Sequence, residues 1–291
     1  MCRLFALHAG AEPVAATFWL LEAPHSLSEQ SHRNPDGAGI GAFRPDGTPT
    51  LDKQPLAAWQ DHEFVSAART LRSTTFVAHV RYASTGARTT ANTHPFAEDG
   101  RILAHNGVIT DLPAIDARLR TLGARHLVHG DTDSERLFAM ITAETARCDG
   151  DITAGLTAAV TWVIEHVPVY ALNIVVATAT DLWALRYPRT HELHVLDRPP
   201  GGTGTDRPLD AWTSRIRAHS DPLGSRPSVV VASEPMDDDP AWRLLDPGEL
   251  LHIDAGLRHE STRPFPPTPR HLLRRSDLDP DAEASQHPRG P

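Results

Sequence analysis

Two predicted helices follow one another directly in the middle of a chain whose other segments are mostly short strand patterns. Thr132-Asp133-Ser134-Glu135 has the form of a capping box, with Thr at the cap position and Glu three residues later, and it predicts the start of the first helix. The second helix is predicted over about 152–166, after a break at 149–151. Strands on both sides of a helix pair favour an α+β sandwich, in which helices cover sheets, over an alternating βαβ fold.

The predicted strands are short runs rich in β-branched or alternating apolar residues between turn signals. Before the helix pair they lie at 2–8, 38–43, 50–54, 75–80 and 102–105, the last ending at Asn106-Gly107. After the pair they lie at 170–178, 182–187, 192–196, 228–233 and 249–253. Further helices are predicted at 15–21, 61–73 and 111–123.

These elements predict one domain over residues 2–260. A segment at about 199–227 is rich in Gly and Pro and is predicted to be an inserted loop. Over residues 261–291 proline and charge dominate and no periodicity remains, which predicts a disordered tail.

The composition excludes several function classes. A formal net charge of −9, without a basic run, argues against nucleic-acid binding. No apolar run approaches the roughly 20 residues that span a bilayer. The only two cysteines, Cys2 and Cys148, suit a reducing compartment, so we expect a cytoplasmic protein. His126 and His129 have helical spacing but no accompanying Cys or Glu, and no Gly-rich phosphate loop is present, so we expect neither a metal nor a cofactor.

The residue after the start methionine is Cys2. Its small side chain allows removal of the methionine, which would place a thiol and a free α-amine on one residue. The reference pKa values of these groups are roughly 8.5 and 8, so the amine can accept the proton of the thiol near neutral pH. Nucleophile and base would then come from one residue. An ordinary buried cysteine at the start of a strand explains the same pattern.

Three further positions supply the groups that a γ-glutamyl amide needs. Arg81 closes a predicted strand, where an arginine is either solvated or a bidentate partner for a carboxylate. Asn106-Gly107 is a favoured turn, and its amide and backbone N–H could also stabilise an oxyanion. Asp133 in the first turn of a helix is stabilised by the helix dipole, or binds an ammonium group.

The order of several short stretches resembles the class II glutamine amidotransferases, which are N-terminal-nucleophile hydrolases with a four-layer αββα fold. The stretches are Met1-Cys2-Arg3-Leu4, Asp36-Gly37-Ala38-Gly39, His79-Val80-Arg81-Tyr82-Ala83-Ser84-Thr85-Gly86, Asn92-Thr93-His94-Pro95-Phe96, His105-Asn106-Gly107 and Asp131-Thr132-Asp133-Ser134-Glu135. The later segment 231–242 resembles the stand-alone branch, which includes the γ-glutamyl amidohydrolase of ergothioneine biosynthesis.

The resemblance implies a mature chain that begins at Cys2, with this residue as nucleophile and its own amine as base. It implies that Arg81 and Asp133 bind the α-carboxylate and α-amine of the glutamyl unit. It also implies an oxyanion hole made by Asn106 with Gly107.

Ser84 falls where the family often places a small polar contact to the substrate. The chain departs from the stand-alone branch at Ala38, where that branch usually has Trp. The insertion and the tail are also longer than the resemblance predicts, which leaves the leaving group open.

Taken together, these features predict a hydrolase that cleaves a γ-glutamyl amide through a thioester on Cys2. We expect the substrate to be a γ-glutamyl conjugate, as in ergothioneine biosynthesis, because a freestanding glutaminase would waste glutamine. The alternative is a glutaminase subunit that supplies ammonia to a separate synthase partner. A non-catalytic protein that binds amino acids or other proteins is the third reading, and a retained Met1 would favour it.

Overall fold

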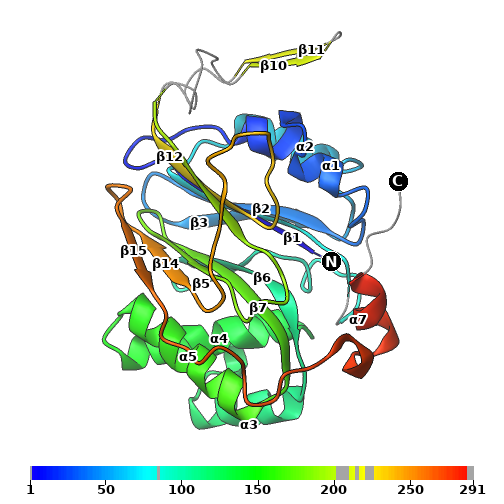
Figure 1. The fold of residues 1–291 in the computed structure, drawn as a ribbon, viewed down its shortest axis with the longest axis vertical. Helices are drawn as coiled ribbons and strands as arrows, with labels where there is room; N and C mark the ends of the chain where they lie inside the picture. Colours follow the sequence, from blue (N-terminus) through cyan, green and yellow to red (C-terminus); the bar gives the residue numbers. More distant parts are fainter. Residues whose placement is uncertain (1, 84–85, 201–209, 214–215, 220–225, 287–291) are drawn as a thin grey trace.

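Two antiparallel β-sheets lie face to face between two layers of helices (Figure 1). The structure is a computed structural model and describes residues 2–83, 86–200, 210–213, 216–219 and 226–286. The arrangement confirms the predicted four-layer αββα sandwich, an α+β fold.

The first sheet has the strand order β13-β9-β12-β1-β4-β2-β3. Its strands are β1 (Arg3–His8), β2 (Ala38–Phe43), β3 (Pro49–Gln54), β4 (Thr75–Val80), β9 (His194–Arg198), β12 (Ser228–Ala232) and β13 (Arg243–Leu244). The helices that cover its outer face are the short π-helix η1 (Phe18–Glu22), α1 (Leu27–Gln30) and α2 (His62–Thr70).

The second sheet has the order β15-β14-β8-β7-β6-β5. Its strands are β5 (Phe96–Glu98), β6 (Arg101–Ile109), β7 (Val169–Ala177), β8 (Leu182–Leu185), β14 (Leu250–Ile253) and β15 (His259–Thr262). Its outer face is covered by α3 (Leu112–Thr121), η2 (Arg125–Leu127), α4 (Asp133–Arg147) and α5 (Ile152–His166).

Strand β1 shows how alternating side chains build separate core layers. Phe5 and Leu7 pack toward η1 and α2, whereas Leu4 and Ala6 pack against the second sheet. A third core layer lies between the second sheet and α3, α4 and α5. Full burial of a large apolar side chain contributes roughly 1.5–3 kcal/mol, so both faces of β1 anchor it in the sandwich.

Helix α4 begins where the capping box predicts. The Thr132 hydroxyl accepts a hydrogen bond from the Glu135 N–H at 3.2 Å. Among the described residues, the Glu135 carboxylate accepts from the Gly130 N–H at 2.6 Å rather than from the N–H of the cap residue. Only the Thr half of the predicted box is therefore observed, and the Glu half ties the preceding loop to the helix.

Strand β6 is longer than predicted, because Asn106-Gly107 does not end it. Asn106 pairs with Asn173 and Gly107 with Leu172, and the strand continues to Ile109. A Cβ on Gly107 would lie 1.9 Å from the carbonyl oxygen of Ala171. Glycine is required here by the close approach of β7 rather than by a turn.

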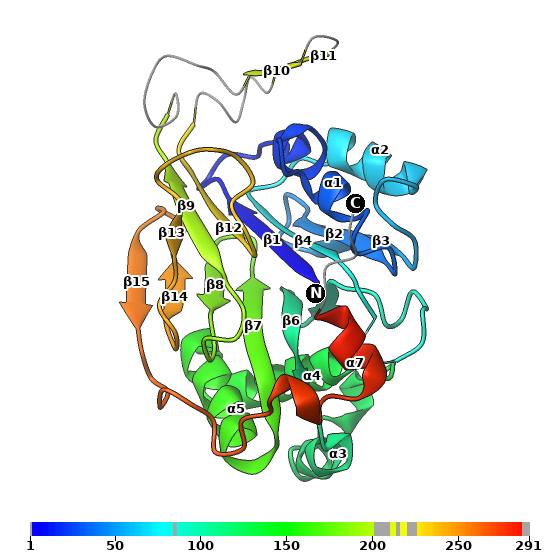
Figure 2. The ribbon, with the colours of Figure 1, turned by 45° about the vertical axis from the view of Figure 1, so that its right-hand side comes forward.

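The predicted disordered tail is wrong over residues 261–286, which form regular elements packed on the domain. The segment contains η3 (Arg275–Asp277) and α7 (Pro280–Ser285), and Phe265 packs edge-on against Tyr187. No sequence pattern indicated this order, for two reasons. The buried apolar residues of the segment are too far apart for a periodic pattern, and its hydrogen bonds to Val169 are made by backbone atoms. Figure 2 shows α7 beside the N-terminal end of β1.

The predicted insertion at 199–227 lies partly outside the described residues. Within it the structure describes a two-stranded ribbon of β10 (Asp210–Thr213) and β11 (Ile216–His219). The domain boundary at residue 260 stays a prediction.

The close contact between the two sheets at Gly41 gives a test of the packing. A Cβ at Gly41 would lie 2.9 Å from Cγ2 of Ile102 in the facing sheet. We expect Gly41→Ala to lower the free energy of unfolding by about 1–3 kcal/mol through overpacking. Because Ile102→Ala removes the clashing atoms, the double variant should be less destabilised than the sum of the single variants, as measured by urea unfolding.

Leu196→Ala is the matched control, since Leu196 packs in the core layer on the helix side of the first sheet. Its effect should add to that of Gly41→Ala. Additive effects in both pairs would contradict the proposed contact between the sheets.

Candidate active site

The start of β1 and the end of β4 bring Cys2 to Arg81 and Tyr82. Arg3 pairs with Val80, so the next pair in this antiparallel register is Cys2 and Arg81. The Tyr82 N–H donates to Sγ of Cys2 at 3.2 Å, and the thiol donates to the Tyr82 carbonyl at 3.3 Å. The backbone of Tyr82 therefore fixes the position of the sulfur.

Burial raises the pKa of the Cys2 thiol, and this outweighs the opposite effects of the chain's N-terminal charge, the Tyr82 N–H and the two nearby arginines. The thiol is therefore protonated near neutral pH. A reaction that uses it as a nucleophile needs a base within reach of the sulfur.

Arg81 is buried and belongs to the same cluster. Its guanidinium donates to the carbonyl oxygens of Ala87 at 3.1 Å and Gly86 at 3.2 Å. Burial lowers the pKa of Arg81, while Cys2, Asp36 and Asp133 oppose that change. The thiol and both carboxylates therefore lie within electrostatic reach of this cation.

Asp36 holds the chain segment that follows β4. Its backbone N–H donates to the Arg81 carbonyl at 3.0 Å, and its carboxylate accepts from the Ala83 N–H at 2.9 Å. The same carboxylate pairs with Arg88 at 3.1 Å. Asp36 belongs to one of the sequence motifs, but the spacing of the motif gave no indication that Asp36 contacts Arg81, Ala83 and Arg88.

Strand β6 contributes Asn106 from the opposite sheet. Ile102 and Ala104 of this strand face the first sheet, and Asn106 has the same parity. The side chain is 3% exposed, and its Nδ2 has no hydrogen-bond partner among the described residues. A buried amide donor without a partner costs about 1–3 kcal/mol, so this atom is a candidate contact for a ligand.

Asp133 is the first residue of α4 and is also buried. Its carboxylate accepts from the backbone N–H groups of Ile109 and Ser134, each at 2.9 Å. The Ser134 hydroxyl lies 2.9 Å from Nδ1 of His105, whose pKa is lowered by burial. A carboxylate has about four lone-pair positions, so Asp133 keeps capacity for a further donor.

The structure thus places Cys2 next to Arg81 across the β1–β4 register, with the Asp133 carboxylate at the start of α4 within electrostatic reach of Arg81. Asn106 lies on β6 of the facing sheet. Gly107 lies beside Asn106 on β6. Ser84 lies outside the described residues. Within the described part of the chain, no group of three or more His, Cys, Asp or Glu side chains could hold a metal ion. No described helix is long and apolar enough to cross a membrane.

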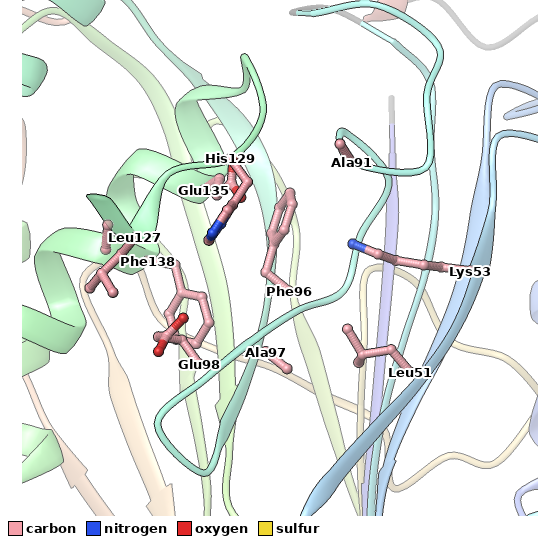
Figure 3. A pocket seen from close by; sticks show the side chains of 11 residues that line it. Leu51, Lys53, Ala91, Phe96, Ala97, Glu98, Leu127, His129, Glu135 and Phe138 are labelled. Atoms are coloured by element: carbon pink, nitrogen blue, oxygen red, sulfur yellow. The ribbon is translucent and has the colours of Figure 1, made fainter. Parts of the chain in front are cut away.

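A separate cavity of about 210 Å³ opens between edge strand β3, strand β5 and helix α4 (Figure 3). Lys53 projects into it, opposite Glu135 and His129. The Lys53 ammonium donates to the Thr93 carbonyl at 2.7 Å and lies 4.7 Å from the centre of the Phe96 ring. Burial lowers its pKa to about 8 against the opposing charge of Glu135.

Comparison with known proteins agrees with the fold and the motifs. A sequence profile of the class II glutamine amidotransferases matches residues 1–275. The gamma-glutamyl-hercynylcysteine sulfoxide hydrolase of Mycobacterium tuberculosis is 31% identical over 266 residues, which cover 87% of this chain and 93% of that protein.

Two solved structures share the fold. A glutamine aminotransferase class-II domain protein from Silicibacter pomeroyi has a TM-score of 0.59 and 21% identity, over 91% of this chain and 100% of that one. The glutamine phosphoribosylpyrophosphate amidotransferase of Bacillus subtilis has a TM-score of 0.61 and 19% identity, over 97% of this chain and 55% of that one.

The two helix-covered sheets form the sandwich fold that these two structures share. The chain belongs to the class II glutamine amidotransferase family. It is an enzyme with amidohydrolase activity.

The lowered pKa of Lys53, the only lysine of the chain, predicts a pH-dependent stability. Unfolding returns this group to a pKa near 10.5, so between pH 8 and 10.5 the unfolded state binds more protons than the folded state. The stability contributed by Lys53 should therefore rise with pH through this window. Urea unfolding should be measured at about pH 7.5, 8.5 and 9.5. Wild type should gain stability relative to Lys53→Met as the pH rises. A constant difference between the two proteins would contradict the assignment.

Proposed function

We propose that the enzyme hydrolyses the γ-glutamyl amide bond of a γ-glutamyl conjugate through a thioester on Cys2. The observation that carries the proposal is the adjacency of Cys2 and Arg81 across the β1–β4 register, with the Asp133 carboxylate within electrostatic reach of Arg81. The relatives named gamma-glutamyl-hercynylcysteine sulfoxide hydrolase support a conjugate of the kind found in ergothioneine biosynthesis.

Removal of Met1 would place a free α-amine on Cys2, and this amine is the proposed base. It accepts the proton of the thiol, whose pKa is raised, while the Tyr82 N–H at 3.2 Å stabilises the resulting thiolate. The thiolate attacks the γ-carbonyl carbon of the substrate. The ammonium group then returns the proton to the leaving amine, and water hydrolyses the thioester to release glutamate.

Arg81 and Asp133 are the proposed partners of the glutamyl head group. The guanidinium binds the α-carboxylate as a fork, and the carboxylate of Asp133 accepts from the α-ammonium. Ser84, in the same segment as Arg81, is proposed as a further polar contact to the substrate. These contacts orient the γ-carbonyl toward the sulfur, which lowers the entropic part of the barrier.

Asn106 and Gly107 are the proposed oxyanion hole. The Nδ2 donor of Asn106 has no partner among the described residues, so it is available when the carbonyl oxygen acquires negative charge. One such donor typically contributes about 3–4 kcal/mol to transition-state stabilisation.

Replacement of the proposed nucleophile tests the function directly. Cys2→Ala should abolish release of glutamate from glutamine and from a panel of γ-glutamyl compounds, measured with purified protein. Cys148→Ala is the control, because this cysteine lies at the end of α4, and it should retain activity. Turnover by Cys2→Ala near the wild-type rate would remove Cys2 from the mechanism. Turnover that requires a co-purifying synthase would favour the alternative of a glutaminase subunit.

Asn106 of β6 and its partner Asn173 of β7 allow an effect on catalysis to be distinguished from an effect on stability. Asn106→Ala should lower kcat by about 10²–10³ with little loss of stability, because Nδ2 loses no protein partner. Asn173→Ala should instead lower the free energy of unfolding by about 1–3 kcal/mol, because its side chain bonds the Glu192 carbonyl and the Tyr187 N–H. Steady-state kinetics and thermal unfolding measure both effects. Unchanged kcat in Asn106→Ala would refute the oxyanion role.

A further inference from the structure

The cavity between β3, β5 and α4 (Figure 3) has no part in the reaction proposed above. None of the described residues with a role in that reaction lines it. Its volume is about 210 Å³, below the roughly 300 Å³ at which pockets for drug-sized ligands begin. The cavity therefore suits a small metabolite that binds apart from the proposed nucleophile.

Lys53 places an incompletely paired cation on the β3 side of the cavity. Its ammonium has three N–H donors, and the described residues supply one hydrogen-bond acceptor, the Thr93 carbonyl at 2.7 Å. The Phe96 ring, 4.7 Å away, adds a weak cation–π attraction. Among the described residues no carboxylate forms an ion pair with this ammonium, and Glu135 acts on it only through its charge. Because a half-buried cation without a carboxylate is costly, a carboxylate of a ligand would stabilise it.

The opposite side of the cavity is acidic. Glu135 of α4 and Glu98 of β5 line it there, together with His129. Oε2 of Glu135 accepts from the Gly130 N–H at 2.6 Å, whereas its Oε1 lies 3.6 Å from Nδ1 of His129, beyond hydrogen-bond distance. The two carboxylates outnumber the single cation of Lys53. They would repel a simple anion, but they would attract an ammonium group on the same ligand.

Apolar side chains separate the two charged sides. In Figure 3 the Phe96 ring lies between Lys53 and His129. The other apolar lining residues are Leu51, Ala97, Leu127, Phe138 and Ala139. Phe96 and Phe138 also belong to the core between the second sheet and its helices, so this apolar surface is held in place by the fold. An aliphatic group of a ligand would gain affinity by burying its area against them.

We propose that this cavity binds a free aliphatic α-amino acid of about the size of leucine. Its α-carboxylate pairs with Lys53, and its α-ammonium pairs with Glu135 and Glu98. Its side chain packs against Phe96 and Phe138. This is a second site for a zwitterion, separate from the one proposed for the glutamyl head group, and it does not depend on whether the chain hydrolyses γ-glutamyl amides.

Calorimetric titration of the purified protein with leucine and three analogues tests the proposal. 4-Methylpentanoate lacks the ammonium group, 3-methylbutylamine lacks the carboxylate, and glycine lacks the apolar side chain. Leucine should bind at one site, and each analogue should bind at least about tenfold more weakly, the effect of one charge-assisted hydrogen bond or of one buried aliphatic side chain. An absence of leucine binding would overturn the proposal. Binding of either charged analogue as tightly as leucine would also overturn it.

Lys53→Met tests whether the binding occurs in this cavity. In this variant leucine and 3-methylbutylamine should bind equally, because the carboxylate of leucine has lost its partner. Arg44→Met is the matched control, since Arg44 is an exposed cation between β2 and β3, and it should bind leucine as wild type does. An unchanged preference for leucine over 3-methylbutylamine in Lys53→Met would contradict the assignment of the carboxylate to Lys53.

Arg81→Met distinguishes this cavity from the proposed glutamyl site, which could also accept a zwitterion. Leucine should bind Arg81→Met with the wild-type affinity, because Arg81 does not line the cavity. Loss of leucine binding in Arg81→Met, in a protein whose thermal unfolding matches wild type, would place leucine in the glutamyl site and refute the second site. None of these titrations needs turnover, so the outcome stands whether or not the hydrolase function is confirmed.

Discussion

The antiparallel pairing of β1 with β4 is the constraint on which the rest of the site depends. It aligns Arg3 with Val80 and so places Cys2 next to Arg81 and Tyr82. Both polar backbone atoms of Tyr82 contact the sulfur. A shift of this register by one residue would turn the thiol to the opposite face of the sheet, because side chains alternate along a strand. The buried faces of β1 oppose such a shift, so the hydrophobic core also fixes the geometry of the nucleophile.

Hydrogen bonds and an ion pair of Asp36 and Asn92 support the segments around the proposed site. Asp36 holds the segment after β4 through Ala83 and Arg88, and Asn92 bonds Ala87 and Asp131. These contacts connect the loop that holds Arg81 with the start of α4. An active site needs such support because small displacements of reacting groups reduce the rate strongly.

Local patterns of apolar and capping residues were sufficient for the α+β class and for the start of α4. The four-layer arrangement followed from the family resemblance. The order of short motifs also indicated Cys2, Arg81, Asn106 and Asp133 as candidate site residues, and their roles stay predictions. The sequence misplaced Asn106-Gly107 in a turn, because a glycine required by the carbonyl of a neighbouring strand has the same local pattern as a turn glycine. The carbonyl that requires this glycine belongs to Ala171, which comes 64 residues after Gly107 in the chain.

The ordered segment after residue 260 was missed for a related reason. Its placement depends on long-range contacts of β7 with the segment near Leu272 and of His191 with Gln286, which no local pattern records. The contacts of Asp36 could not be predicted either, since an acidic residue in a turn motif gives no indication of the loop that it binds.

The buried groups around Arg81 set the electrostatics of the proposed site. Burial lowers the pKa of His79 to about 3 and lowers the pKa values of His94 and His105, so these imidazoles are neutral near Arg81 at neutral pH. Arg81 is then the buried cation beside these imidazoles, with Asp133 as an acceptor at the start of α4. Since isolated buried charges are costly, the carboxylate and ammonium of a glutamyl head group would each replace lost hydration with a charged partner. The buried Arg81, with the carboxylates of Asp36 and Asp133 within its reach, is therefore consistent with the zwitterionic head group of the proposed substrate.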